Sequence, residues 1–266
     1  MSSAEPVPTG PGVARPVDVL DRSLRDASTP TGTRRWLLER AAIGAAGLAA
    51  ATAAIPADGA LARSRHDSVE EFGVFASTTE ALTVTILTEL VRRARLHPEV
   101  PRSVSGIFDA VYAAERDHWL FIRKLYRPST TRFWLPDAFF GGAGDALDLT
   151  AVGKGVAAGE HLFVNTYLVG VTTYAAAGRS KLARYSAELA AVESEHRVLG
   201  QTLAGASPPN DLGFAVFEFD RVSQIKGALM GAGIGLGQQA KSAGRFYDLQ
   251  RPPAAPSAPI SSNEPR

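Results

Sequence analysis

The chain has 266 residues, no cysteine and almost balanced charge, with 28 basic and 27 acidic side chains. Proteins that bind duplex nucleic acid carry clustered basic charge, so this balance gives no reason to expect a nucleic-acid partner. The absence of cysteine excludes disulfides, thiolate-bound metals and a rubredoxin-like centre.

The first 62 residues have the pattern of a twin-arginine export signal with an extended n-region. Arg34 and Arg35 precede an Ala- and Gly-rich run over 41–55, and residues 60–62 supply a small-x-small cleavage site. The run is shorter than the roughly 20 apolar residues that a spanning helix needs. The pattern predicts export by the twin-arginine machinery and an extracellular, periplasmic or envelope-associated mature protein. An uncleaved N-terminal anchor is the alternative.

The next segment, residues 63–206, predicts an all-α domain of four helices. Pro98 and Pro101 interrupt the first connection, and Gly178 marks a short third connection as a helix stop. Residues 128–150 form a longer crossover between the second and third helices, and we expect its aromatic side chains to cover the helices. The expected helices are 67–95, 101–126, 150–177 and 179–204, and the crossover aromatics are Phe133, Trp134, Phe139 and Phe140.

The C-terminal part predicts a helical extension over 207–249, with a fifth helix at 214–243, and a disordered Pro-, Ala- and Ser-rich tail over 250–266. Gly227, Gly231 and Gly235 recur every four residues. Such spacing allows a close approach to another helix of this chain or of a second subunit, so a homo-oligomer is one interpretation.

The most informative feature is a duplicated pattern within the four helices. Glu80 is followed by a Glu-x-x-His segment with Glu115 and His118. Glu160 is followed by a second one with Glu193 and His196. Residues three positions apart lie on the same side of a helix, so each pair can converge on one ion.

These acids occur among apolar residues at helical spacing, which predicts that they face a core. Burying four carboxylates costs several kcal/mol per ion without compensation. Two divalent cations would bring four carboxylates and two neutral imidazoles near neutrality, and this donor set suits iron or manganese, with zinc also open.

Other polar residues are interpreted as solvated or as packing groups. Glu89 lies near the end of the first helix and is expected in solvent, as are Asp117, Glu188 and Glu195. His161 is rotated by about 100° from its neighbour Glu160 and is not expected to be a ligand. Three tyrosines could lie near the site as electron relays, although core packing is the preferred interpretation: Tyr112, Tyr167 and Tyr174.

On these Glu and His residues, over roughly 67–206, the chain resembles the ferritin-like superfamily, and more closely its secreted or desiccation-related branch. The resemblance implies a ferritin-like four-helix bundle with a carboxylate-bridged two-metal centre. It also implies oxidation of Fe(II) with O2 or peroxide, with two iron ions as the cofactor. Manganese in a peroxide-dismutating enzyme, and a structural metal in a non-catalytic envelope or stress protein, are the alternatives. The implied ligands are Glu80, Glu115, His118, Glu160, Glu193 and His196.

Overall fold

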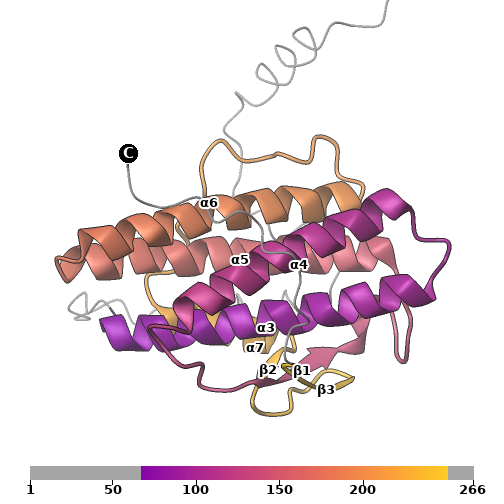
Figure 1. Cartoon of the computed structure of the whole chain (residues 1–266), viewed down its shortest axis with the longest axis horizontal. Coiled ribbons are helices and arrows are strands. Elements are labelled where there is room, and N and C mark those ends of the chain that lie inside the picture. The colour runs from indigo at the N-terminus through magenta and orange to yellow at the C-terminus, as the bar shows by residue number, and fades with distance from the viewer. Residues whose placement is uncertain (1–66, 251–266) are drawn as a thin grey trace, which may run out of the picture. The chain divides into compact units, whose positions relative to one another are not determined.

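The computed structural model describes residues 67–250, so the predicted export signal over 1–62 and nearly all of the predicted tail over 250–266 lie outside the described residues. The described chain is mostly helical. Four long helices lie alongside one another (Figure 1), and their bounds differ from the expected ones by a few residues at each end. They are α3 Val69–Leu96, α4 Arg102–Ile122, α5 Leu149–Ala176 and α6 Ser180–Leu203.

Local signals in the sequence explain where these helices begin and end. Ser68 starts α3 with a capping box, in which its hydroxyl accepts from the Glu71 backbone N–H at 3.1 Å and its own N–H donates to the Glu71 carboxylate at 2.8 Å. The Asp148 carboxylate accepts from two backbone N–H groups at the start of α5. Gly178 has a φ of 70° between α5 and α6, which confirms the predicted helix stop.

The closest packing among the four helices is between α5 and α6, and it depends on glycine. A Cβ atom on Gly153 would lie 2.4 Å from the backbone nitrogen of Ala204, and one on Gly200 would lie 2.7 Å from the backbone nitrogen of Ala157. No side chain fits between the two backbones at these points. The sequence therefore brings α5 and α6 together through paired glycines, which fixes the relative positions of their polar residues.

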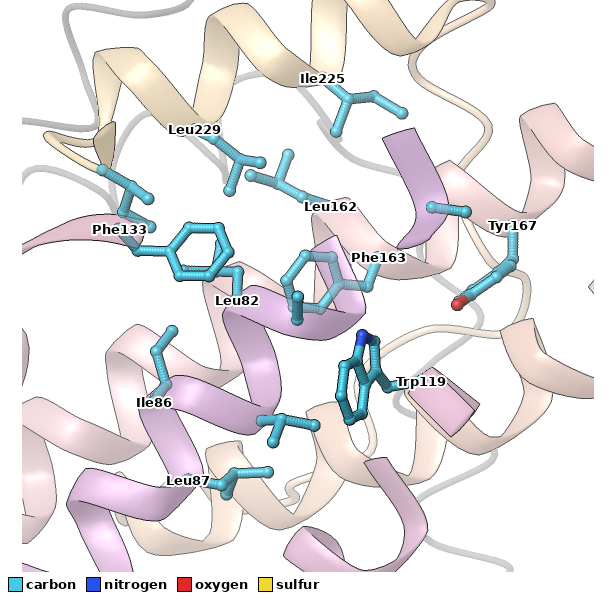
Figure 2. Close-up of a cluster of buried hydrophobic side chains, with 14 of the residues drawn as sticks. Leu82, Ile86, Leu87, Trp119, Phe133, Leu162, Phe163, Tyr167, Ile225 and Leu229 are labelled. Carbon is cyan, nitrogen blue, oxygen red and sulfur yellow. The ribbon is translucent and has the colours of Figure 1, made fainter. Parts of the chain in front are cut away.

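The hydrophobic core is continuous across the helices, and Figure 2 shows part of it around Trp119, Phe163 and Leu87. Helix α3 is apolar and long enough to span a membrane by length and composition, but 83% of its most apolar stretch is buried inside the protein. This burial is typical of a core helix. Thr79, Thr83 and other threonines of α3 donate their hydroxyl hydrogens to backbone carbonyls of the preceding turn, which satisfies them within the core.

A small sheet joins the crossover to the C-terminal part of the chain, and the sequence did not predict it. Strand β1 (Arg132–Pro136) is central, with β2 (Gly235–Leu236) and β3 (Gly244–Asp248) antiparallel on either side. A short 3-10 helix, η1 (Asp137–Phe140), follows β1. The crossover aromatics Phe133, Trp134 and Phe140 are buried, as expected, because this sheet packs against the helices.

The fifth helix is much shorter than the predicted 214–243. Helix α7 covers only Val222–Gly231 and packs against α3 and α5. After it, Gly233 has a φ of 84° and the chain turns into β2. The close approach at Gly235 is between strands and not between helices as predicted: Gly235 belongs to β2, and a Cβ atom there would lie 2.9 Å from the Trp134 side chain of β1. Gly227, by contrast, has open space around it among the described residues.

A buried ion pair also corrects the prediction that Glu89 is solvated. Glu89 is buried because Arg93, fully buried itself, donates to its carboxylate at 2.7 Å. The Arg93 guanidinium also donates to the Ala146 carbonyl at 2.5 Å and to the Tyr247 hydroxyl at 3.0 Å, and it lies 3.9 Å from the centre of the Phe140 ring. One arginine therefore joins α3 to the crossover and to β3.

Candidate metal centre

The structure brings all six predicted ligand side chains together in the interior between the four long helices. Helix α3 supplies Glu80, α4 supplies Glu115 and His118, and α5 supplies Glu160. Helix α6 supplies two more, Glu193 and His196. Glu115 and Glu193 have no exposed surface, whereas the His118 side chain is the most accessible of the six at 13%.

Each histidine lies close to the glutamate of the opposite Glu-x-x-His segment as well as to its own. His196 Nδ1 is 2.6 Å from Glu115 Oε1 and 3.2 Å from Glu193 Oε2. His118 Nδ1 is 3.2 Å from Glu193 Oε1 and 3.6 Å from Glu115 Oε2. The glutamates of α4 and α6 therefore lie between the two imidazoles, and both rings present Nδ1 to them.

The ligand atoms form two overlapping groups, each with atoms within 4.8 Å of one another. The first group joins Glu80 and His118 to the shared pair, and the second joins Glu160 and His196 to the same pair. The shared pair is Glu115 and Glu193. A buried Glu and His cluster of this kind could hold a metal ion.

Buried carboxylate oxygens that accept no hydrogen bond also indicate that the cluster could hold a metal ion. Among the described residues, Glu80 Oε2, Glu160 Oε2, Glu193 Oε1 and both carboxylate oxygens of Glu115 are buried without a hydrogen bond. His196 Nδ1 hydrogen-bonds with Glu193 Oε2 and also lies 2.6 Å from Glu115 Oε1, so one ring nitrogen faces two buried carboxylates. Native interiors rarely contain so many unsatisfied polar atoms in one place, and a site for a metal ion is one of the accepted explanations.

Protonation shows how the metal-free cluster avoids an excess of negative charge. Burial, followed by the charges of neighbouring carboxylates, raises the pKa of Glu80 and of Glu160 well above the ordinary value. Burial would lower the pKa of His196, but the carboxylates of Glu115 and Glu193 outweigh it and raise this pKa to about 9. The same two carboxylates raise the pKa of His118 well above its ordinary value.

The carboxyl group of Glu115 behaves in the opposite way. Burial alone would raise its pKa, but contacts with His118 and His196 hold it below the ordinary value. Burial and neighbouring charge thus favour the protonated forms of Glu80, Glu160 and both imidazoles when no cation is bound. Metal ions bind the deprotonated forms of these groups, so metal binding at this cluster would release protons.

A tyrosine extends the cluster beyond the predicted ligands. Tyr167 on α5 donates its hydroxyl hydrogen to Glu80 Oε1, and Figure 2 shows its ring entering the core with the hydroxyl foremost. Burial, followed by the nearby carboxylate charges, raises the pKa of Tyr167 well above its ordinary value, so the phenol remains a donor. Sequence reasoning preferred core packing for Tyr167. Its position two turns after Glu160 was the signal that it could reach the site.

The other residues considered from the sequence lie elsewhere. His161 Nε2 approaches Glu218 at 2.9 Å, and His161 belongs to neither of the two ligand groups among the described residues. Tyr174 makes an edge-to-face contact with Phe72, with ring centres 5.2 Å apart, so its role is packing. Tyr112 is buried, and its hydroxyl has no hydrogen-bond partner among the described residues.

Comparison with known proteins adds no assignment: no family model, curated protein or solved structure matches the chain.

Proposed function

We propose that residues 67–206 form a ferritin-like four-helix bundle that holds two divalent metal ions and oxidises Fe(II) with O2 or peroxide. One observation carries the proposal: Glu115 and Glu193 belong to both ligand groups. Carboxylates shared in this way can bridge two ions, whereas separate sites would each need their own acids.

The order of the ligands along the chain also supports the proposal. In ferritin-like carboxylate proteins, two helices each supply a single Glu and the other two each supply a Glu-x-x-His segment. This chain has the same arrangement, with single glutamates on α3 and α5 and Glu-x-x-His segments on α4 and α6. The long crossover between α4 and α5 is consistent with the same family of folds.

The residues of this chain have distinct parts in the proposed site. Glu80 and His118 would complete the shell of one ion, and Glu160 and His196 that of the other, with Glu115 and Glu193 shared. Four carboxylates balance the four positive charges of two divalent ions when the imidazoles are neutral. Iron bound there would supply the redox chemistry: two electrons from two Fe(II) ions, with two protons, would reduce O2 to hydrogen peroxide and leave two Fe(III) ions.

The protein environment determines what reaches the site. The apolar core around the cluster keeps bulk water away, and His118 has the most exposed side chain among the proposed ligands. We infer that small oxidants approach from the His118 side, since the other five side chains are more deeply buried.

Fe(II) oxidation assays test the reaction. Purified protein is given Fe(II) under air, and the appearance of Fe(III) absorbance is compared with hydrogen peroxide decomposition by the manganese-loaded protein. We expect Fe(II) oxidation well above the buffer rate, with Glu160→Gln slowed strongly and Glu195→Gln, an exposed change on α6, unaffected. Rapid peroxide decomposition only with manganese would favour a dismutase, and binding without either reaction would favour a structural metal.

We also propose that the protein is exported by the twin-arginine route. The proposal depends on Arg34, Arg35 and the weakly apolar run that follows them. That route carries folded proteins, so the metal would be loaded before export, where the cell controls which ion is available.

A further inference from the structure

The two ligand groups have the same residue types but different surroundings, and Tyr167 is the main difference. It lies two helical turns after Glu160 on α5, yet its hydroxyl group contacts Glu80 on α3. The tyrosine therefore belongs to the helix that supplies Glu160 to the second ligand group, but its hydroxyl contacts Glu80 of the first group. It is buried, with 1% of its surface exposed, so water does not compete for this hydrogen bond.

The position of Tyr167 is fixed by its neighbours. Ser186 on α6 donates to the Tyr167 backbone carbonyl at 2.7 Å. One turn further along α5, a Cβ atom on Gly170 would lie only 2.3 Å from Ser186 Oγ and 2.3 Å from the ring of Phe72. Because α3, α5 and α6 are in close contact here, the phenol has little freedom to move away from Glu80.

The equivalent position on the other side has no such donor. Leu87 lies two turns after Glu80 on α3, as Tyr167 does after Glu160 on α5, and it is a buried aliphatic side chain. Among the described residues, Glu80 Oε2 and Glu160 Oε2 are both buried without a hydrogen bond, so the difference lies at Glu80 Oε1, which accepts from the phenol. Glu80 therefore accepts a hydrogen bond from a phenol, whereas the residue two turns after Glu80 is an aliphatic side chain that cannot donate one.

We propose that Tyr167 is a positioning residue that fixes the Glu80 carboxylate for metal binding and makes the Glu80 group the tighter of two unequal metal positions. This inference rests on the proposed two-metal centre. Partners that orient a metal ligand usually contribute about 10- to 100-fold to metal affinity. The hydrogen bond leaves Glu80 Oε2 free to bind the ion while Oε1 is held by the phenol.

Calorimetric and absorbance titrations with Co(II), which binds the same oxygen and nitrogen donors, test the inference on the metal-free protein. Wild type should bind Co(II) in two steps of different affinity. Tyr167→Phe should weaken the tighter step by about tenfold or more and leave the weaker step unchanged. Tyr174→Phe is the matched control, since it removes another buried phenol of α5 that packs on Phe72, and it should leave both steps unchanged.

Two further variants identify the steps without depending on the fold of Tyr167→Phe. Glu80→Gln should abolish the tighter step, and Glu160→Gln should abolish the weaker one. If Glu160→Gln removes the tighter step, or if Tyr167→Phe binds Co(II) as wild type does, the role of Tyr167 is refuted while the two-metal centre stands. Wild type that binds no Co(II) would refute the proposed metal centre itself, and the inference with it.

Discussion

His196 Nδ1 lies 2.6 Å from Glu115 Oε1, although the two residues belong to different Glu-x-x-His segments on different helices. The reciprocal contact, His118 to Glu193, measures 3.2 Å. The histidine of each Glu-x-x-His segment therefore contacts the glutamate of the other segment. A change in Glu115 or Glu193 should for this reason affect both proposed ion positions.

Replacing Glu115 with Gln should reduce binding at both positions. The side chain keeps its shape but loses the charge and one anionic oxygen that both ligand groups share. We expect the amount of metal retained after dialysis to fall from two ions towards none, measured by inductively coupled plasma mass spectrometry. Glu195→Gln, an exposed change on the same helix as His196, should retain the wild-type amount. Full metal content in Glu115→Gln would show that this carboxylate is not a shared ligand.

The metal-free protein should lose stability as pH rises. Glu80, Glu160, His118 and His196 all have raised pKa values in the folded state. A raised pKa stabilises the fold fully below the unfolded-state pKa, and this contribution is lost as pH rises through the folded-state pKa. For His196 that window extends from its ordinary value of 6.5 to about 9. The lowered pKa of Glu115 gives a contribution that is fully present above its ordinary value of 4.5 and is lost only below it, so it does not change within this window.

Thermal unfolding of chelator-treated protein, measured from pH 6.5 to about pH 9, tests this loss of stability. We expect the melting temperature to fall over this range, and we expect added metal to reduce the fall because cations replace the bound protons. Metal affinity should rise with pH for the same reason. A melting temperature of the metal-free protein that increases over this range would contradict the proposed protonation of the cluster.

The Arg93 ion pair should contribute far more to stability than its neighbour in sequence. Arg93→Ala would leave Glu89 and two further acceptors without their buried donor, so we expect a loss of about 3–5 kcal/mol in unfolding free energy. Arg92 also binds Glu89, but its side chain is 44% exposed, and Arg92→Ala should cost at most about 1 kcal/mol. Urea unfolding of both variants makes the comparison. Equal losses of unfolding free energy in the two variants would mean that burial does not determine how much the Arg93 ion pair stabilises the fold.

The site was more predictable from the sequence than the small sheet. Helical spacing placed Glu115 with His118 and Glu193 with His196, because ligands three residues apart depend only on local geometry. Strand β1 is five residues long and pairs with residues 244–248, so no local signal reports it. The burial of Glu89 was also missed: its partner Arg93 lies one turn away, but Arg93 is itself buried by contacts with Ala146 and Tyr247 that form only in the folded chain. Sequence periodicity can show that one face of a helix is buried. It does not show which distant group forms hydrogen bonds with a polar side chain on that face.

Replacing Arg34 and Arg35 together with Lys should stop export. The twin-arginine pair is the part of the signal that its machinery recognises, so we expect the precursor to accumulate in the cytoplasm with metal bound. Immunoblots of cytoplasmic and exported fractions measure the distribution. Arg40→Lys, a conservative change outside the pair, is the control and should be exported normally. Efficient export of the double variant would point to another route.

The metal content of the purified mature protein tests the central claim most directly. Elemental analysis after dialysis without chelator, repeated after incubation of the metal-free protein with Fe(II) or Mn(II), gives the number of ions per chain. The two overlapping ligand groups predict two ions per chain, lost on chelation and restored on incubation. A folded protein that contains no metal and takes up neither ion would contradict the account.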